Sequence, residues 1–302
     1  MIPLAKKIWL DGKFVEWNKA NVHVLTHGLH YGSSVFEGIR CYKTDKGGAI
    51  FRLDDHIERF FYSAQCLGMR IPFSKSVITK AILDIVRINK AKECYIRPIA
   101  FYGYGKMGLS PAGAPTQLAI ASWQWNIKRV DERGVSVKIS PFIRLHPRSV
   151  AIKAKLGGYY VNSIFASNDA KKNGFQEALL LDYKGYVAEG SGNNLFMVKN
   201  KIIYTPSPDN ILSGITRDSI MKIARDFGIK VIEKKIKPSE LKKADEVFLV
   251  GTAVEVWPVL KIDTARINNG RVGGTTGKLI NEYQKIIHGE NRKYHKWLTF
   301  VK

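Results

Sequence analysis

The spacing of apolar residues alternates along this chain between the period of a strand and the period of a helix. Up to about Ala121 both periods occur in turn, beginning with a hairpin that we expect at Lys7–Glu16 around the turn Asp11–Gly12. Further along the chain short strands dominate and helices interrupt them. This mixture predicts an α+β fold and argues against a doubly wound parallel sheet.

Two amphipathic helices are expected in the first part. In the segment 55–67 the apolar residues recur on one helical face, with Asp54 as the expected N-cap and Arg59 beside the apolar stripe. The segment 74–89 repeats the same period. A strand expected at 93–101 follows the second helix.

Side chains alternate between the two faces of a strand, so Tyr95 and Arg97 are expected to share one face. Between residues 122 and 134 the apolar period fails and charged residues gather, which indicates an interdomain loop. The expected domains are therefore a small one at 1–121 and a large one at 135–302.

The second part is expected to combine short strands with three helices. At 302 residues the chain is long enough to bury two medium-sized cores. The strands are expected at 135–140, 177–182, 186–188, 194–199, 201–205 and 246–250, and the helices at 160–173, 215–227 and 276–288.

The chain is strongly basic, with 48 Lys and Arg against 26 Asp and Glu and a formal net charge of +22. Clustered basic residues would indicate nucleic-acid binding, because they neutralise phosphates. Here they are scattered among acidic residues, as at Lys234 and Lys235 beside Glu233. We therefore expect a solvated, Lys-rich surface and no nucleic-acid partner.

The three cysteines, Cys41, Cys66 and Cys94, follow neither a disulfide pattern nor a zinc-binding pattern, which fits a reducing compartment. The histidines have no metal-ligand spacing, so no metal site is expected. No apolar run is long enough for a signal peptide or a membrane span. We expect a cytoplasmic protein without a membrane partner.

Two residues could carry chemistry. Lys155 precedes the pair Gly157–Gly158, where the backbone can bend and another group can approach closely. Glu189 ends an expected strand among glycines, and a carboxylate there could keep a heterocyclic nitrogen protonated, as an electron-sink cofactor requires. Taken alone, each is more often a solvated surface residue.

Three further features favour the binding of an anionic ligand. The segment Ser213–Asp218 opens an amphipathic helix, whose free amides and the Thr216 hydroxyl could bind a negative group. Small residues at Gly251–Ala253 expose amides after a strand, and Arg59 is a cation suited to bidentate contacts. With the two residues above, they indicate an amine, a counter-acid for a ring nitrogen and an anion-binding cradle.

These segments resemble the class IV aminotransferases, the pyridoxal-phosphate enzymes of fold type IV, and more narrowly the branched-chain amino acid aminotransferases. Three blocks carry the resemblance: His30–Arg40, Tyr95–Pro98 and Glu189–Phe196. The likeness runs from Ile8–Gly12 to Trp297–Thr299. It implies a small N-terminal α/β domain and a larger cofactor-binding domain with a barrel-like sheet.

The resemblance also implies which residues bind the cofactor, pyridoxal 5'-phosphate. Lys155 would form a Schiff base with it, Glu189 would pair with the pyridine nitrogen, and Tyr160 would hydrogen-bond the phenolic oxygen. The phosphate would be held by Arg59, Ile215, Thr216 and Thr252.

The implied substrate pocket is completed between two subunits, which implies at least a homodimer, with a higher homo-oligomer as the alternative. Its own-chain residues would be Tyr31, Phe36, Gly38, Tyr95, Arg97, Trp125, Thr252 and Ala253, and the neighbouring subunit would lend Met107, Gly108 and Leu109. Two positions depart from the family pattern. Lys128 bears on the pocket wall, and Asn193 bears on the surroundings of the cofactor.

The implied reaction is the reversible transamination of leucine, isoleucine and valine with 2-oxoglutarate, as in branched-chain amino acid biosynthesis. Lys155 would be both covalent anchor and general base for a 1,3-proton shift. Alternatives of the same fold are D-amino acid transaminase, amine transaminase and aminodeoxychorismate lyase. The blocks Tyr95–Arg97 and Phe36–Arg40 argue against them. A basic nucleic-acid-binding protein, the alternative from another class, would be colourless and would show steep salt-dependent binding.

Overall fold

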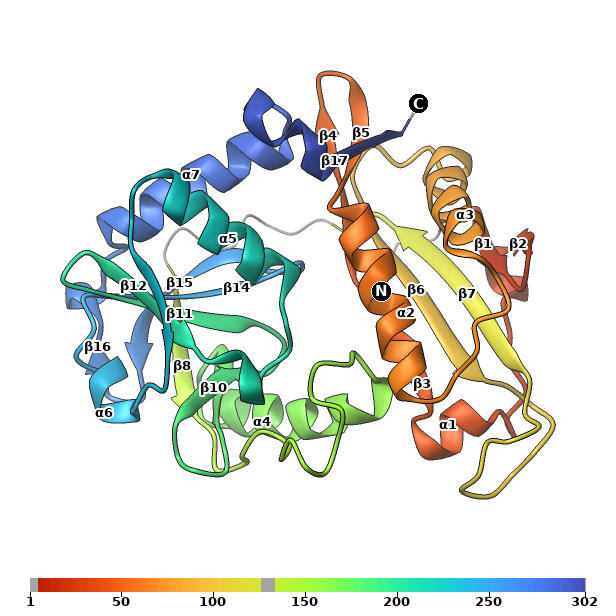
Figure 1. The fold of residues 1–302 in the computed structure, drawn as a ribbon, viewed down its shortest axis with the longest axis horizontal. Coiled ribbons are helices and arrows are strands. Elements are labelled where there is room, and N and C mark those ends of the chain that lie inside the picture. Colours follow the sequence, from red (N-terminus) through yellow and green to blue (C-terminus); the bar gives the residue numbers. More distant parts are fainter. Residues whose placement is uncertain (1–4, 126–133, 302) are drawn as a thin grey trace. The chain divides into compact units, whose positions relative to one another are not determined.

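The computed structural model describes residues 5–125 and 134–301, which form two compact units (Figure 1). The first unit contains Met1–Asn126, Ala154–Tyr159 and Lys285–Lys302, and the second contains Ile127–Lys153 and Tyr160–Gln284. The domains expected at 1–121 and 135–302 divide the chain at one place. In the structure, residues 154–159 and the C-terminal segment from Lys285 belong to the first unit, so the chain passes between the two units several times. Pairing explains the difference. Leu156 bridges β3 (Ser34–Phe36), and the last strand, β17 (Leu298–Val301), pairs with β5 (Gly47–Phe51), so both segments join the first unit.

The first unit is built on an eight-stranded sheet in the order β17-β5-β4-β6-β7-β1-β2, with β3 beside β6, and its ladders are antiparallel. Its strands are β1 (Lys7–Leu10), β2 (Lys13–Glu16), β3 (Ser34–Phe36), β4 (Ile39–Thr44), β5 (Gly47–Phe51), β6 (Cys94–Tyr102), β7 (Thr116–Trp123) and β17 (Leu298–Val301). The hairpin expected at Lys7–Glu16 is confirmed, and Asp11 takes the positive φ of 46° that its turn requires.

Helices α2 and α3 confirm the two helices expected from periodicity. The helices of this unit are α1 (His27–Tyr31), α2 (Leu53–Cys66) and α3 (Lys75–Ile88), with 3-10 turns η1 (Trp17–Lys19), η2 (Gly157–Tyr159) and η5 (Arg292–Trp297). The hydroxyl of Ser74 caps α3. The prediction of Asp54 as the N-cap of α2 is wrong, because Arg52 occupies that position with a φ of 52°. Asp54 lies in the first turn instead, where its charge complements the helix dipole.

A proline interrupts pairing in the middle of the first sheet. Pro98 lies in β6, and the N–H and C=O of a strand residue face the same neighbour, so Pro98 offers a carbonyl but no N–H on that side. The carbonyl accepts a hydrogen bond from the amide of Glu37 at 2.9 Å. Strand β3 ends at Phe36 and β4 begins at Ile39. Glu37 and Gly38 are therefore free of the regular ladder.

The second unit is built on a nine-stranded mixed sheet in the order β10-β9-β8-β15-β14-β11-β12-β13, with β16 beside β15. Its strands are β8 (Val135–Ile139), β9 (Glu177–Leu181), β10 (Val187–Gly190), β11 (Asn194–Lys199), β12 (Ile202–Pro206), β13 (Val231–Lys234), β14 (Glu246–Gly251), β15 (Glu255–Ile262) and β16 (Ala265–Arg266). Pairs β8/β9, β8/β15 and β12/β13 are parallel and the others are antiparallel. Segregated helices and a mixed sheet confirm the α+β class.

The helices of the second unit are α4 (Tyr160–Lys172), α5 (Ile215–Asp226), α6 (Pro238–Leu241) and α7 (Gly274–Ile287), with 3-10 turns η3 (Pro208–Asn210) and η4 (Asn268–Gly270). Helix α5 packs against β14, and α4 packs along β8 and β9 (Figure 1). In the described part of the chain, no helix combines the length and the apolar character that crossing a membrane requires.

The central strands of the second sheet are buried on both faces. Phe196 of β11 stacks on Phe248 of β14 with ring centroids 5.1 Å apart. Their sequence neighbours Leu195 and Leu249 point the other way, into a cluster that includes Val137. Burial on both faces explains why residues 247–250 of β14 form an uninterrupted apolar run and not an alternating one.

Candidate active site

Lys155 is held by its backbone in the first unit. Its amide donates to the hydroxyl of Ser63 on α2 at 2.9 Å, and its carbonyl accepts from the amide of Phe36 at 3.2 Å. The next residue, Leu156, makes a bridge to Val35. The segment therefore runs beside β3 as a short extra strand, which fixes the Cα from which the amine projects.

The glycines that follow Lys155 permit a close approach of two backbones. A Cβ on Gly157 would lie 2.2 Å from the hydroxyl oxygen of Ser34, and one on Gly32 would lie 2.8 Å from the Cα of Gly158. Gly32 also has a φ of 62°, which disfavours a side chain. The close approach expected at this pair is confirmed.

Two cations lie close to the ring of Phe36. The Nζ of Lys155 is 5.0 Å from the ring centroid, and the guanidinium carbon of Arg97 is 4.7 Å from it. The Nη2 of Arg97 donates to the hydroxyl of Tyr95 at 3.1 Å, which confirms that these two residues share a face of β6.

Arg97 has spare hydrogen-bonding capacity. Its Nε is buried and has no hydrogen-bond partner, and no carboxylate among residues 5–125 and 134–301 forms an ion pair with it. An unsatisfied buried donor on a cation is costly unless a ligand completes it. Arg97 is therefore suited to bind an anionic ligand.

Aromatic side chains form a wall beside Arg97. The ring of Tyr95 is 5.0 Å from that of Trp123 and 5.0 Å from that of Trp125. A Cβ on Gly38 would lie 1.9 Å from the Tyr95 hydroxyl, so any side chain here would displace the Tyr95 ring. The predicted residues Phe36, Gly38, Tyr95, Arg97, Trp125 and Lys155 are thus brought together in the first unit, whereas Lys128 lies outside the described residues.

Arg59, predicted to bind an anion, pairs with a residue that the sequence analysis did not select. Its Nε and Nη2 donate to the two carboxylate oxygens of Glu37 at 2.6 and 2.8 Å. The Nδ1 of His56 lies 2.8 Å from one of these oxygens. Glu37 and His56 are buried and Arg59 is nearly so.

Burial and mutual contacts determine the protonation states of Glu37, His56 and Arg59. Burial opposes ionisation of Glu37, but the charge of Arg59 and the hydrogen bonds from Arg59 and His56 outweigh it, and the pKa of Glu37 lies far below its ordinary value. Burial also lowers the pKa of His56, although Glu37 opposes this shift. At neutral pH the cluster is an anion, a cation and a neutral imidazole.

Helix α2 connects this cluster to Lys155. Ser63 donates its hydroxyl hydrogen to the carbonyl of Arg59 at 2.8 Å and accepts the amide hydrogen of Lys155. His56, Arg59 and Ser63 follow the spacing i, i+3, i+7 of one helical face. That spacing was visible in the sequence and could have identified His56 and Ser63.

His27 holds two predicted pocket segments together at α1. Its ring nitrogens contact the hydroxyl of Ser33 at 2.7 Å and the carbonyl of Gly108 at 2.8 Å, and its ring is 4.5 Å from that of Tyr31. The side chains of Met107 and Leu109, on either side of Gly108, are exposed. The resemblance assigns these two to the neighbouring subunit's pocket.

In the second unit Glu189 is a buried carboxylate with several donors. Its Oε1 accepts from the Nε of Arg144 at 2.5 Å, and its Oε2 accepts from the side chain of Asn194 at 3.1 Å and the amide of Leu212 at 3.2 Å. The β9/β10 register shifts between Val187 and Glu189, a bulge that re-aims the side chain. Arg144, missed by sequence analysis, compensates the buried charge.

The turn after Glu189 is anchored by another buried carboxylate. Glu177 accepts from the hydroxyl of Ser191 at 2.6 Å and from the side-chain amide of Asn193 at 3.0 Å. A second carboxylate at position 193 would face Glu177, so the amide at this position fits its neighbour. The departure at Asn193 therefore affects the support of the turn.

The start of α5 is a suitable anion site. Its N-cap, Gly214, has no side-chain cap, and the first-turn residues Ile215 and Thr216 are buried. A Cβ on Gly214 would lie 1.9 Å from the side-chain oxygen of Asn194, the residue that also contacts Glu189. The first-turn amides of a three-turn helix attract anions.

Three predicted residues lie elsewhere in the second unit. Tyr160 is the first residue of α4, and Thr252 and Ala253 occupy the turn between β14 and β15. Their positions at a helix start and after a strand end are those expected from the sequence. Their assignment to the cofactor and the substrate stays a prediction.

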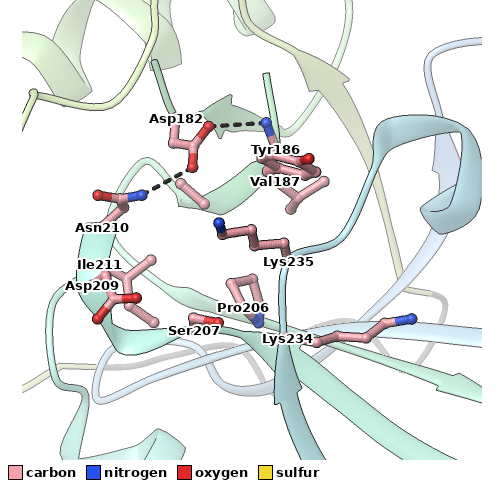
Figure 2. Close-up of a pocket in the computed structure, with 11 residues that line it drawn as sticks. Asp182, Tyr186, Val187, Pro206, Ser207, Asp209, Asn210, Ile211, Lys234 and Lys235 are labelled. Atoms are coloured by element: carbon pink, nitrogen blue, oxygen red, sulfur yellow. Dashed lines mark hydrogen bonds between the residues drawn. The ribbon is translucent and has the colours of Figure 1, made fainter. Parts of the chain in front are cut away.

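A small cavity in the second unit is distinct from these residues (Figure 2). Asp182 in its wall accepts from the amide of Tyr186 and the side chain of Asn210, each at 2.9 Å. Its volume of about 20 Å³ suffices for one water molecule. None of the predicted site residues lines it.

Comparisons with known proteins identify the family of this chain. The model of the amino-transferase class IV family matches residues 34–262. The chain is 44% identical over 298 residues to a branched-chain-amino-acid aminotransferase of Pseudomonas aeruginosa, covering 98% of this chain and 97% of that one. It is 39% identical over 304 residues to the Escherichia coli K12 protein of that name, covering 98% of each.

Solved structures give the same result. The branched-chain amino acid aminotransferase of T.th., complexed with N-(5'-phosphopyridoxyl)-L-glutamate, has a TM-score of 0.96 and 44% identity, over 100% of both chains. The enzyme of that name from Thermoproteus uzoniensis with norvaline has a TM-score of 0.95 and 39% identity, over 99% of this chain and 100% of that one. The chain therefore belongs to the class IV aminotransferases.

Proposed function

We propose that the protein is a pyridoxal-phosphate-dependent branched-chain aminotransferase, which exchanges the amino group of leucine, isoleucine or valine reversibly with 2-oxoglutarate. The observation that carries this proposal is the pair of cations on the Phe36 ring. One is the amine of Lys155, and the other is Arg97, whose buried Nε lacks a partner among the described residues. An amine beside a cation that can still bind a carboxylate fits an α-amino acid substrate.

The donor set of the chain fits the cofactor. An uncapped helix start suits a phosphate, and a buried carboxylate compensated by arginine suits a ring N–H. Similar structures are complexes with pyridoxamine 5'-phosphate and N-(5'-phosphopyridoxyl)-L-glutamate. When bound, pyridoxal phosphate supplies an aldehyde for the amine and a ring that stabilises negative charge at the substrate α-carbon.

Lys155 is the covalent anchor and the general base. The hydrogen bonds of its backbone to Ser63 and Phe36 keep its Cα fixed. When free, the amine would therefore be positioned to take the proton of the substrate α-carbon and to return it. Glu189, whose charge Arg144 compensates, would accept the ring N–H.

The other predicted residues bind and orient. The proposed cofactor ligands are Tyr160 for the phenolic oxygen and Arg59, Ile215, Thr216 and Thr252 for the phosphate. The proposed substrate residues are Tyr31, Phe36, Gly38, Tyr95, Arg97, Trp125, Thr252 and Ala253, with Met107, Gly108 and Leu109 from the neighbouring subunit.

One pocket has to accept a leucine-like and a glutamate-like side chain. Phe36 and Trp125 provide apolar surface, and Tyr31 and Tyr95 provide hydroxyls at its rim. Apolar burial favours the branched-chain substrate, whereas hydroxyls and Arg97 offer partners to a carboxylate. This composition supports the dual specificity.

A half-reaction screen tests the proposal. The cofactor-loaded protein is mixed with leucine, isoleucine, valine, alanine, glutamate, D-alanine or a simple amine, and the cofactor absorbance is followed. We expect rapid conversion with leucine, isoleucine, valine and glutamate, and slow conversion with the others. Fastest conversion with D-alanine or with the amine would assign the protein to another activity of the same fold.

We also propose that the protein is a cytoplasmic homodimer. The segment around α1 and the loop around Gly108 expose several apolar side chains, among them Val24, Leu29 and Leu109. Exposed apolar patches mark interaction surfaces, and a second copy is the partner that the shared pocket requires. Three free cysteines fit a reducing compartment.

Mixed dimers test whether the pocket is shared. A subunit with Lys155→Ala and a subunit with Leu109→Asp are each expected to be inactive as homodimers. In the mixed dimer one of the two sites has an intact lysine and an intact neighbouring loop. Activity should therefore return on mixing, and a mixture that stays inactive would contradict a shared pocket.

A further inference from the structure

Glu37 lies where two parts of the site meet within the first unit. Its neighbours in the chain are Phe36 and Gly38, both predicted pocket residues, and its amide is held by the Pro98 carbonyl at 2.9 Å. Its side chain points to α2, where it receives two hydrogen bonds from Arg59.

The contact between Glu37 and Arg59 is bidentate, and this geometry fixes the orientation of the guanidinium. A bidentate pair sets the plane and the rotation of the arginine side chain, whereas a single hydrogen bond leaves both variable. The carboxylate is fully buried, so water does not compete for it. His56 holds one carboxylate oxygen at 2.8 Å and thereby limits rotation of Glu37 itself.

We propose that Glu37 is a positioning residue for the phosphate of the cofactor: it orients the Arg59 guanidinium and ties it to the pocket wall at Phe36 and Gly38. The inference rests on the proposed function, because it takes Arg59 as a phosphate ligand. Glu37 itself touches neither the cofactor nor the substrate in this assignment.

A glutamine at position 37 would alter the pair without changing its size. It presents one oxygen and one NH2 group, so one nitrogen of Arg59 would face another donor. The guanidinium then turns away from the orientation that serves the phosphate. A merely structural ion pair would weaken the fold but would not distinguish ligands with a phosphate from ligands without one.

The test compares pyridoxamine 5'-phosphate with pyridoxamine, because neither forms a covalent bond with Lys155. Dissociation constants are measured by calorimetry on the apoenzyme and on Glu37→Gln. We expect the variant to bind pyridoxamine phosphate about tenfold or more weakly and pyridoxamine with less than about twofold change. Equal losses for both ligands, or no loss for either, would overturn the proposal.

Arg59→Gln gives an independent check. It should cause the same phosphate-selective loss, and Glu37→Gln added to it should cause no further selective loss, because both changes remove one interaction. Additive losses would contradict positioning through Arg59. If Glu37→Gln does not fold, His56→Ala replaces it, with a smaller selective loss expected and an unselective one counting against the proposal.

A matched control is Glu93→Gln. Glu93 also pairs with a buried arginine of the first sheet, Arg40, at 3.1 Å. We expect unchanged binding of both ligands, and a phosphate-selective loss in this variant would overturn the assignment to Glu37. If the native apoenzyme bound neither ligand, the proposed function would fail, whereas normal native binding with an unselective Glu37→Gln would refute this inference alone.

Discussion

Each unit contains a buried carboxylate paired with a guanidinium. In the first unit Glu37 receives two hydrogen bonds from Arg59 and a contact from His56. In the second unit Glu189 receives a hydrogen bond from the Nε of Arg144, and neutral amides of Asn194 and Leu212 also donate to it. The same two chemical groups are thus held in different ways.

The difference lies in which partner faces the ligand. In the proposed assignment Arg59 binds the phosphate and the carboxylate supports it, so a bidentate pair that fixes the guanidinium is suitable. Glu189 binds the ring nitrogen and Arg144 supports it, and the neutral amides of Asn194 and Leu212 share in holding the carboxylate. Each supporting residue carries the charge opposite to the residue it positions, which compensates the buried charge before the ligand binds.

The largest expected effect is that of removing Lys155, which leaves the Glu37–Arg59 and Glu189–Arg144 pairs unchanged. Lys155→Ala should lower the rate of transamination by about 10⁴-fold or more, because it removes the anchor and the general base together. The two pairs remain, so the variant should still bind pyridoxal phosphate without a covalent bond. The measurements are steady-state kinetics, and mass spectrometry after borohydride reduction. A cofactor still reducibly attached to this variant would refute the assignment of Lys155.

Secondary structure was predictable where the apolar period is regular. Helices α2 and α3 and strand β11 agree with the expected ranges within two residues. Strand β17 was not predicted, because it is defined by pairing with β5, about 250 residues earlier in the chain, and has no local signal. Similarly, Arg52 starts α2 through a left-handed conformation that residue preferences do not favour.

The residues proposed to contact the ligand were easier to identify from the sequence than the residues that position them. Lys155 and Glu189 stand among glycines, and that pattern is visible in the sequence. Arg144 and Glu177 are ordinary charged residues in the sequence, and only folding brings them to the Glu189 segment. Glu37 was within a recognised block, but nothing local links it to Arg59, 22 residues away on another element.

A second prediction compares variants of Glu189 and Arg59, the residue of each pair that is proposed to contact the cofactor. Glu189→Gln should lower kcat by about a hundredfold, since it removes the anion that keeps the ring nitrogen protonated. Arg59→Gln should mainly weaken cofactor affinity and leave kcat at saturating cofactor within about tenfold. Titration of the apoenzyme and kinetics at saturating cofactor separate these outcomes. The reverse pattern would exchange the roles of the two units.

A third prediction concerns the supporting arginine. Arg144→Gln should lower kcat by about tenfold, less than Glu189→Gln, because Asn194 and Leu212 still hold the carboxylate. Arg144→Lys keeps the charge and should recover part of the loss. Kinetics at saturating cofactor for the three variants test the order. A loss in Arg144→Gln that equals or exceeds that of Glu189→Gln would place Arg144 on the ligand.

The pair in the first unit also differs from the other in having an imidazole beside it. Burial lowers the pKa of His56 below its ordinary value of 6.5, so the unfolded chain takes up a proton as the pH falls through 6.5 while the folded chain does not. The folded state therefore loses stability below pH 6.5. Glu37 adds a separate loss only below its ordinary pKa of 4.5, because its folded pKa is lowered.

The smallest expected effect is the pH dependence of Tm that follows from this imidazole. Between pH 7 and 5, His56→Asn should reduce the fall in Tm by a few degrees, since asparagine can donate to Glu37 but does not titrate. Asn194→Ala, at the second pair, should lower Tm without changing its pH slope. Thermal unfolding followed by circular dichroism at both pH values measures the slopes. Equal slopes in the native protein and His56→Asn would show that the imidazole of His56 is not held neutral by burial.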